Sequence, residues 1–271
     1  MKKIIITIDD VGLNKDVNDA FLELQHKTFL NFCTTTNTKE FKAIKTVLKQ
    51  NNNTGIHLNI CEKKPILEQK NNLLISKNGD FNNSFIKILI NSYNKKYLNQ
   101  VEKEFRAQIE KSIKNEIKPS FINSHIHIHS IPRIFNLTCK LAKEYKIPNV
   151  RTQNELFYFC HPTKDYPLNI VKNIILKIFT KINKKTLRKY NLKTNDYMIG
   201  ILYTGKMNKE TIFEGIKKII KENTVTEIIL HPTTNKIKKT NYIELLTLLN
   251  EDFEKELREL NVNIINWKEN I

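Results

Sequence analysis

The chain has 271 residues, 40 % of them apolar, which is enough for one large domain or two small ones with a sizeable core. No apolar run approaches the roughly 18 residues of a membrane span, and the N-terminal "MKKIIITIDD" is no signal peptide because its apolar run stops at two aspartates. The formal net charge of +17 comes from lysines spread along the whole chain, without any RNA-binding, zinc-finger or helix-turn-helix pattern. We therefore expect no specific nucleic-acid partner.

The predicted elements alternate between short β-rich runs and longer helical patterns. In chain order, the predicted strands are 2–8, 31–38, 54–60, 120–129, 148–152, 197–204, 226–232 and 262–267. The predicted helices are 14–28, capped near Asn14, and 38–50, 95–115 and 132–147. This repeated alternation predicts a mostly parallel sheet, and at this length it favours a (β/α) barrel over an open sheet.

Two stretches depart from this alternation. Residues 62–98 are turn-rich, with a predicted turn around Gly79. Residues 163–197 contain the amphipathic, lysine-rich "LNIVKNIILKIFTKI", for which a surface helical insertion is favoured over a membrane-surface or partner helix. With no repeat and no long linker, we expect a single domain over 1–271 that includes this insertion at about 163–197.

The four cysteines, Cys33, Cys61, Cys139 and Cys160, are far apart and form no CxxC pair. We interpret them as reduced core thiols, and not as a zinc knuckle or a disulfide framework. Together with the missing membrane span and signal peptide, this predicts a cytoplasmic protein.

Titratable side chains gather at the carboxyl ends of five predicted strands. They are Asp9, Asp10, His57, His125, His127, Arg151 and His231. Because reactive side chains of (β/α) barrels cluster at this end, we expect these residues to meet at one rim. Each also has a structural interpretation: "DDVG" as a solvated turn, His57 as a core histidine, His231 as a strand end, and the alternating histidines of "INSHIHIHSIP" as the wet face of a strand.

The combination of aspartates and histidines predicts a catalytic divalent metal. One aspartate and two histidines, with open positions for water, suit such an ion. On a strand, two of the alternating histidines can share a metal, or one binds it while the next faces the substrate. Two adjacent carboxylates can then divide the work, one as a ligand and the other as a general base.

The segments "ITIDDVGLN", "GIHLNI", "INSHIHIHSIP", "VRT" and "LHP" resemble, in order and spacing, the motifs of YdjC-like carbohydrate deacetylases, which include the chitooligosaccharide deacetylases. The resemblance runs from residue 1 to about 151, thins out through 152–220 and returns at "EIILHP". It implies a distorted (β/α) barrel of the polysaccharide-deacetylase type. It further implies a metal-dependent hydrolase that releases acetate from an N-acetylated sugar or short oligosaccharide.

The resemblance also implies a role for each site residue. Asp10, His57 and His125 would hold one divalent ion, Mg²⁺ or Zn²⁺. Asp9 would be the general base and His231 the acid that protonates the departing amine, while His127 and Arg151 would line the substrate cleft. His129 is expected to be structural.

One position departs from the family pattern. The family usually has aspartate where this chain has Asn123. Asparagine accepts the same hydrogen bond from a ligand histidine but supplies no charge, so we expect weaker metal binding or an altered metal preference.

Three alternatives stay open at this point. The first is another metallohydrolase on a barrel, a phosphoesterase or an amidohydrolase, which would need more than one metal. The second is a non-catalytic carbohydrate-binding relative, and the third is a basic nucleic-acid binder. A small carbohydrate is the expected partner, and a homodimer also stays open.

Overall fold

The computed structural model describes residues 2–68 and 72–270, so the ends and residues 69–71 of the predicted domain lie outside the described part. The strands are β1 (Lys3–Val11), β2 (Leu30–Thr34), β3 (Thr54–Leu58), β4 (Phe121–Ser124), β5 (Asn149–Val150), β6 (Tyr197–Ile199), β7 (Val225–Leu230) and β8 (Asn263–Ile264). The helices are α1 (Lys15–Leu24), α2 (Phe41–Gln50), α3 (Phe85–Asn91), α4 (Lys95–Lys114), α5 (Pro132–Glu144), α6 (Tyr166–Tyr190), α7 (Lys209–Ile219), α8 (Lys239–Leu249) and α9 (Phe253–Glu259), with 3₁₀ turns η1 (His125–Ser130) and η2 (Trp267–Glu269).

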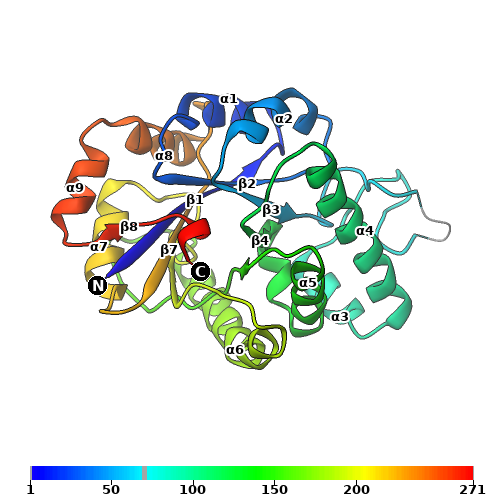
Figure 1. Ribbon diagram of the computed structural model, residues 1–271. Helices are drawn as coiled ribbons and strands as arrows, with labels where there is room; N and C mark the ends of the chain where they lie inside the picture. Colours follow the sequence, from blue (N-terminus) through cyan, green and yellow to red (C-terminus); the bar gives the residue numbers. More distant parts are fainter. Residues whose placement is uncertain (1, 69–71, 271) are drawn as a thin grey trace.

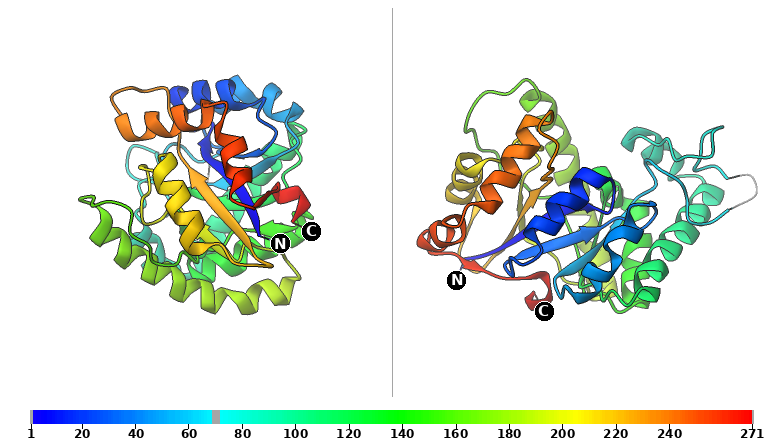
Figure 2. Two further views of the ribbon diagram at one scale, coloured as in Figure 1. Left: turned by 90° about the vertical axis from the view of Figure 1, so that its left-hand side faces the viewer. Right: turned by 90° about the horizontal axis from the view of Figure 1, so that it is seen from above.

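The strands form one parallel sheet that curls into a distorted barrel with helices around its outside (Figures 1 and 2). Their order is β5-β4-β3-β2-β1-β7-β6, and β8 pairs with the beginning of β1. Backbone bonds bridge the gap between β5 and β6: the Lys193 amide donates to the Pro148 carbonyl at 2.9 Å, and the Met198 amide to the Asn154 carbonyl at 3.1 Å. The predicted distorted (β/α) barrel is therefore confirmed.

Strand β1 shows how side-chain alternation builds two environments. Ile4, Ile6 and Ile8 belong to the large apolar core beneath the helices. The intervening Ile5 belongs to a small cluster inside the barrel, together with Cys33, Phe121, Ile265 and Trp267. Successive residues of a strand point to opposite faces, so Thr7 and Asp9 also face the barrel interior. The barrel interior is therefore apolar around Ile5, Phe121 and Trp267 and polar around Thr7 and Asp9.

Several predicted elements are confirmed, with ends shifted by a few residues. Helix α1 starts at its predicted cap, where the Asn14 side chain accepts a hydrogen bond from the Val17 amide at 3.1 Å. The predicted turn is present, with Gly79 at φ +84°. Within the described part of the chain all four cysteines are free, but only Cys33 and Cys139 are buried, whereas Cys61 and Cys160 are partly exposed.

The prediction of a strand over 120–129 is wrong in its second half. Strand β4 ends at Ser124, and the histidines belong to the turn η1. Ile126 and His127 have consecutive φ values of 43° and 60°, a left-handed conformation that ends the regular strand here. The three histidines consequently do not share one face of a strand, and their alternation in sequence was misleading.

The lysine-rich segment forms the long helix α6, which runs along the lower edge of the molecule in the left panel of Figure 2. No helix of the described residues is both long enough and apolar enough to cross a membrane.

Candidate metal centre

The side chains of Asp9 and Asp10, at the end of β1, both lie at the candidate site because the strand is irregular there. The pairing of β1 with β2 shifts register between Ile8 and Val11, and Asp10 has a φ of 63°. In a regular strand Asp9 and Asp10 would point to opposite faces. The left-handed conformation at Asp10 breaks that alternation, and aspartate tolerates this conformation better than most residues do.

Asp10, His57 and His125 form the more open of two groups of possible metal ligands that share His57; a third group, Cys160, His161 and Glu210, lies elsewhere on the chain. Oδ1 of Asp10 lies 3.0 Å from Nε2 of His57 and 2.7 Å from Nδ1 of His125. All three ligand atoms lie within 4.8 Å of one another, and the Asp10 side chain is 15 % exposed. One carboxylate and two imidazoles suit a divalent cation such as Zn²⁺, and the opening towards solvent leaves room for water or substrate.

The turn after β4 aims His125 at this group. Because the backbone becomes left-handed at Ile126 and His127, His125 can face Asp10 while the following histidines lie elsewhere. His129 is fully buried, with Nδ1 2.6 Å from the Ser124 hydroxyl and Nε2 2.9 Å from the Gln153 amide nitrogen. These contacts agree with a structural histidine.

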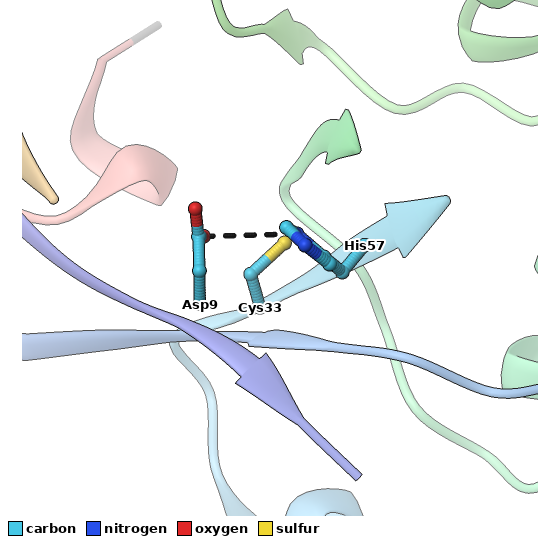
Figure 3. A group of neighbouring side chains, drawn as sticks. All are labelled: Asp9, Cys33 and His57. Atoms are coloured by element: carbon cyan, nitrogen blue, oxygen red, sulfur yellow. Dashed lines mark ion pairs between the residues drawn. The ribbon is translucent and has the colours of Figure 1, made fainter. Parts of the chain in front are cut away.

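A second group of possible ligands, Asp9, Cys33 and His57, lies deeper in the barrel (Figure 3). Oδ1 of Asp9 lies 3.8 Å from Nδ1 of His57. Asn123 already links these side chains: its Oδ1 accepts from Nδ1 of His57 at 2.6 Å and from the Cys33 thiol at 2.7 Å, and its Nδ2 donates to Asp9 at 2.9 Å. Burial and the charge of Asp9 raise the pKa of Cys33 well above its usual value, so the thiol keeps its proton. The group is therefore an internal hydrogen-bond network and the poorer candidate for a metal.

Asn123 also orients the ring of His57. Its carbonyl oxygen can only accept, so Nδ1 of His57 carries a proton, and Nε2 is the nitrogen that faces Asp10 and would bind a metal. This is the arrangement that a metal-binding histidine needs. The amide nitrogen meanwhile donates to Asp9, which an aspartate at this position could not do without binding a proton.

Arg151 lies beneath Asp9 and has no exposed surface. Its guanidinium donates to both oxygens of Asp9, at 2.5 and 3.0 Å, and to both oxygens of the buried Glu227, at 2.7 and 2.6 Å. The resemblance places Arg151 on the cleft wall, whereas in the structure it is an interior partner of two carboxylates. The Arg151 amide still pairs with β4, donating to the Ile122 carbonyl at 3.0 Å, and its side chain points into the barrel towards these carboxylates.

The charges set the protonation of the site. Burial alone would raise the pKa of Asp9, but Arg151 outweighs it and the pKa is lowered. The pKa of Asp10 is held well below its usual value, because His125 and His57 outweigh burial. Burial likewise would lower the pKa of His125, but Asp10 and Glu62 raise it to about 10. Both aspartates are therefore anionic at neutral pH, and a metal that binds here must displace the proton of His125.

His231 lies within electrostatic range of both aspartates, and His127 within that of Arg151 and His231. His231 is half-buried, and its backbone amide donates to Glu244 at 2.6 Å. Burial lowers the pKa of His231, although Asp10 and Asp9 act in the opposite direction. His127 is 5 % exposed, and its Nδ1 has no hydrogen-bond partner among residues 2–68 and 72–270. Burial and then the charge of Lys172 hold its pKa well below the usual value.

Comparisons with known proteins bear on the family and the fold of this chain. The model of the family described as YdjC-like protein matches residues 3–262, nearly the whole chain. The chain belongs to the YdjC-like family. A candidate cellobiose-phosphate cleavage protein from Enterococcus faecalis V583 is 21 % identical, with a TM-score of 0.75 over 99 % of this chain and 98 % of that one, which shows a shared fold.

The other comparisons add little. A mutant of a CE4-family pseudoenzyme with restored enzymatic activity is 11 % identical, with a TM-score of 0.40 over 97 % of this chain and 64 % of that one, and this likeness is too low to carry an argument. No curated protein matches the chain. The family to which the sequence motifs pointed is confirmed, and it is associated with carbohydrate deacetylase activity.

Sequence reasoning missed two residues that complete this YdjC-like site. Glu62 lies 3.1 Å from Nε2 of His125, on the side of the ring away from Asp10. It belongs to the turn-rich stretch whose pattern gave no reason to single it out. Glu227 holds Arg151 from within β7. A charged residue among the apolar residues of "TEIIL" was a usable signal, because a fully buried glutamate requires a partner.

Proposed function

We propose that this protein is a metal-dependent carbohydrate deacetylase that hydrolyses the acetamide of an N-acetylated sugar or short oligosaccharide. The single observation that carries the proposal is the convergence of Asp10, Nε2 of His57 and Nδ1 of His125 beside the Arg151-bound carboxylate of Asp9. Membership of the YdjC-like family supports the choice of reaction. The proposed ion is one divalent metal, Mg²⁺ or Zn²⁺.

Asp10, His57 and His125 would hold the metal, which when bound acts as a Lewis acid towards the acetyl group. Asp9 is the proposed general base. Three of the roughly four lone-pair positions of its carboxylate accept hydrogen bonds from Arg151 and Asn123, which leaves one for a water molecule. Its two fixed partners therefore define where it can take a proton.

His231 is the proposed acid. Water adds to the acetyl carbon and gives a proton to Asp9, the carbon–nitrogen bond breaks, and the sugar nitrogen leaves as an amine with a proton from His231. The products are acetate and a free amino sugar. An amide nitrogen is a very poor leaving group without such protonation. His231 directly follows β7, and burial lowers its pKa although the two aspartates favour its protonated form, so the protonated imidazole gives up its proton readily.

A different metallohydrolase with two metal ions is the nearest alternative. Two of the three groups of possible ligands in the described chain share His57, and Asn123 already occupies the inner one through hydrogen bonds. The third, Cys160, His161 and Glu210, includes an exposed glutamate, and such exposed acidic groups are common without a metal. One metal per chain is therefore the expected stoichiometry, and it favours the deacetylase. A non-catalytic carbohydrate-binding protein would keep the pocket but release no acetate.

The test is acetate release from a panel of N-acetylated mono- and oligosaccharides, with metal-stripped protein and with Zn²⁺ or Mg²⁺ restored. Phosphorylated disaccharides belong in the panel because the similar E. faecalis protein is described by cellobiose-phosphate cleavage. Asp9→Asn and His125→Ala should abolish release, whereas Asp19→Asn, at a partly exposed position on α1, should not. Metal-dependent acetate with this pattern supports the proposal. Bound metal without acetate from any substrate overturns it in favour of a binding protein.

The proposed setting is the cytoplasm, which the four free cysteines fit because reducing compartments keep thiols unpaired. The proposed ligand is a small carbohydrate and not a specific nucleic acid. A gel shift that survives physiological salt would contradict the second statement.

A further inference from the structure

The backbone of His231 lies beyond the last regular pair of the sheet. The register of β1 with β7 ends at Ile8 and Leu230, one residue before His231. Strand β1 is irregular beyond this point, and Pro232, which follows His231, has no amide hydrogen to donate. Contacts from outside the sheet are therefore needed to fix the position of the proposed acid.

Two side chains of α8 bind both polar backbone groups of His231. The Glu244 carboxyl accepts from the His231 amide at 2.6 Å, and the Asn241 side-chain amide donates to the His231 carbonyl at 2.8 Å. Residues three apart lie on the same face of a helix, so a single turn of α8, which lies beside α1 in Figure 1, supplies both contacts. They fix the Cα of His231, and with it the point from which the imidazole extends.

Glu244 also joins His231 to a second loop at the carboxyl end of the barrel. Its other oxygen accepts from the Met207 amide at 3.0 Å, and Met207 belongs to the loop between β6 and α7. The beginning of this loop is held by Glu155, whose carboxyl accepts from the amides of residues 200–202 at 2.7 to 2.8 Å. Because the loop is itself fixed, Glu244 ties the backbone of His231 to a rigid part of the barrel.

The burial of Glu244 has no explanation other than these two amides. Glu244 is fully buried, and its neighbours Leu245 and Leu248 belong to the apolar core. No cation in the described part of the chain forms an ion pair with it, and burial raises its pKa to about 8. A buried acid without a counter-charge is costly, so stability alone would favour an apolar side chain at this position.

We propose that Glu244 and Asn241 are positioning residues that hold His231 where it can protonate the departing nitrogen. The inference rests on the proposed function, in which His231 is the acid. A general acid contributes about 10²- to 10⁴-fold when it lies within hydrogen-bond reach of the atom that it protonates, and a misplacement of about 1 Å can cost roughly a hundredfold. Loss of one α8 contact therefore slows the chemical step and leaves substrate binding nearly unchanged.

The first experiment measures kcat and KM for acetate release from the N-acetylated sugar that the wild type hydrolyses fastest. Glu244→Gln keeps the shape of the side chain, but its amide nitrogen has no lone pair, so it accepts from only one of the two backbone amides. We expect kcat to fall about 10- to 100-fold and KM to change less than about twofold, with Asn241→Ala acting in the same direction. Glu254→Gln is the matched control: Glu254 lies on α9, is 39 % exposed, and should leave both constants unchanged.

A second measurement reports on His231 without turnover. The NMR signals of its imidazole are assigned by their loss in His231→Ala. They should move in Glu244→Gln and in Asn241→Ala but not in Glu254→Gln, while the signals of the interior His129 stay in place.

The two measurements separate positioning from a merely structural role. The proposal is overturned if Glu244→Gln keeps the wild-type kcat, or if kcat falls while the His231 signals do not move. A rise in KM with kcat unchanged also overturns it, because the contact would then serve substrate binding. If the wild type releases no acetate from any substrate, the proposed function fails. The NMR signals still decide the positioning of His231 in that case, since unmoved signals overturn it and moved signals support it.

Discussion

Replacing Arg151 by methionine should be among the most destabilising single changes in this protein. The guanidinium is fully buried and makes hydrogen bonds with Asp9 and Glu227, none longer than 3.0 Å. Without it, Asp9 keeps its contact with Asn123, and Glu227 keeps Thr7 and Trp267, but neither carboxylate keeps a counter-charge. Removing one partner of a buried ion pair costs about 3–5 kcal/mol, so we expect a loss of this size in the free energy of unfolding at pH 8.

The loss should depend on pH in a defined direction. In the native protein Arg151 lowers the pKa of Asp9, so this pair stabilises the fold above the unfolded pKa of aspartate, and the contribution is lost as pH falls. In the variant, burial raises the pKa of both carboxyls above their unfolded values, so stability is lost as pH rises. The difference between the two proteins should consequently be larger at pH 8 than at pH 5.5.

Urea unfolding at both pH values measures this difference. Arg133→Met is the control, because Arg133 is exposed and lies over the ring of Tyr93, so its loss should change stability little. The reasoning is refuted if Arg151→Met costs less than about 1 kcal/mol at pH 8, the range of a surface pair. A cost that does not change with pH would refute it equally.

Three further predictions concern single contacts. Burial raises the pKa of Glu244 to about 8, so the stability that its protonated carboxyl contributes is lost as pH rises from about 4.5 through 8. Glu244→Gln should therefore flatten the fall in the free energy of unfolding between pH 5.5 and 9, and an unchanged slope would contradict this. In Gly55→Ala the new Cβ would lie 2.4 Å from the ring of Phe121, which should lower the free energy of unfolding, measured by thermal unfolding, by about 1–3 kcal/mol. Adding Phe121→Leu should recover part of this loss. Glu62→Gln removes the charge beside Nε2 of His125 and should weaken Zn²⁺ binding about tenfold by calorimetry; equal affinity would show that Glu62 does not orient the ligand.

The sequence by itself determined the class of fold and indicated most members of the candidate site. Alternating β-rich and helical runs predict a parallel barrel because each crossover helix must pack on the sheet. Aspartates and histidines at the carboxyl ends of strands predict one shared rim, since parallel strands end on the same side. Asp10, His57 and His125 do converge there.

Only the tertiary structure decided how these side chains are oriented. The alternation of histidines indicated a strand, but the chain leaves the sheet after Ser124 and becomes left-handed, which local spacing does not reveal. Arg151 was expected at the cleft, yet Glu227, 76 residues away in the chain, holds it in the interior. Such ion pairs between distant residues exist only once the barrel has formed. The same holds for helix α6: its amphipathic period was legible in the sequence, but which side faces the barrel depended on carbonyls that only the folded loops present.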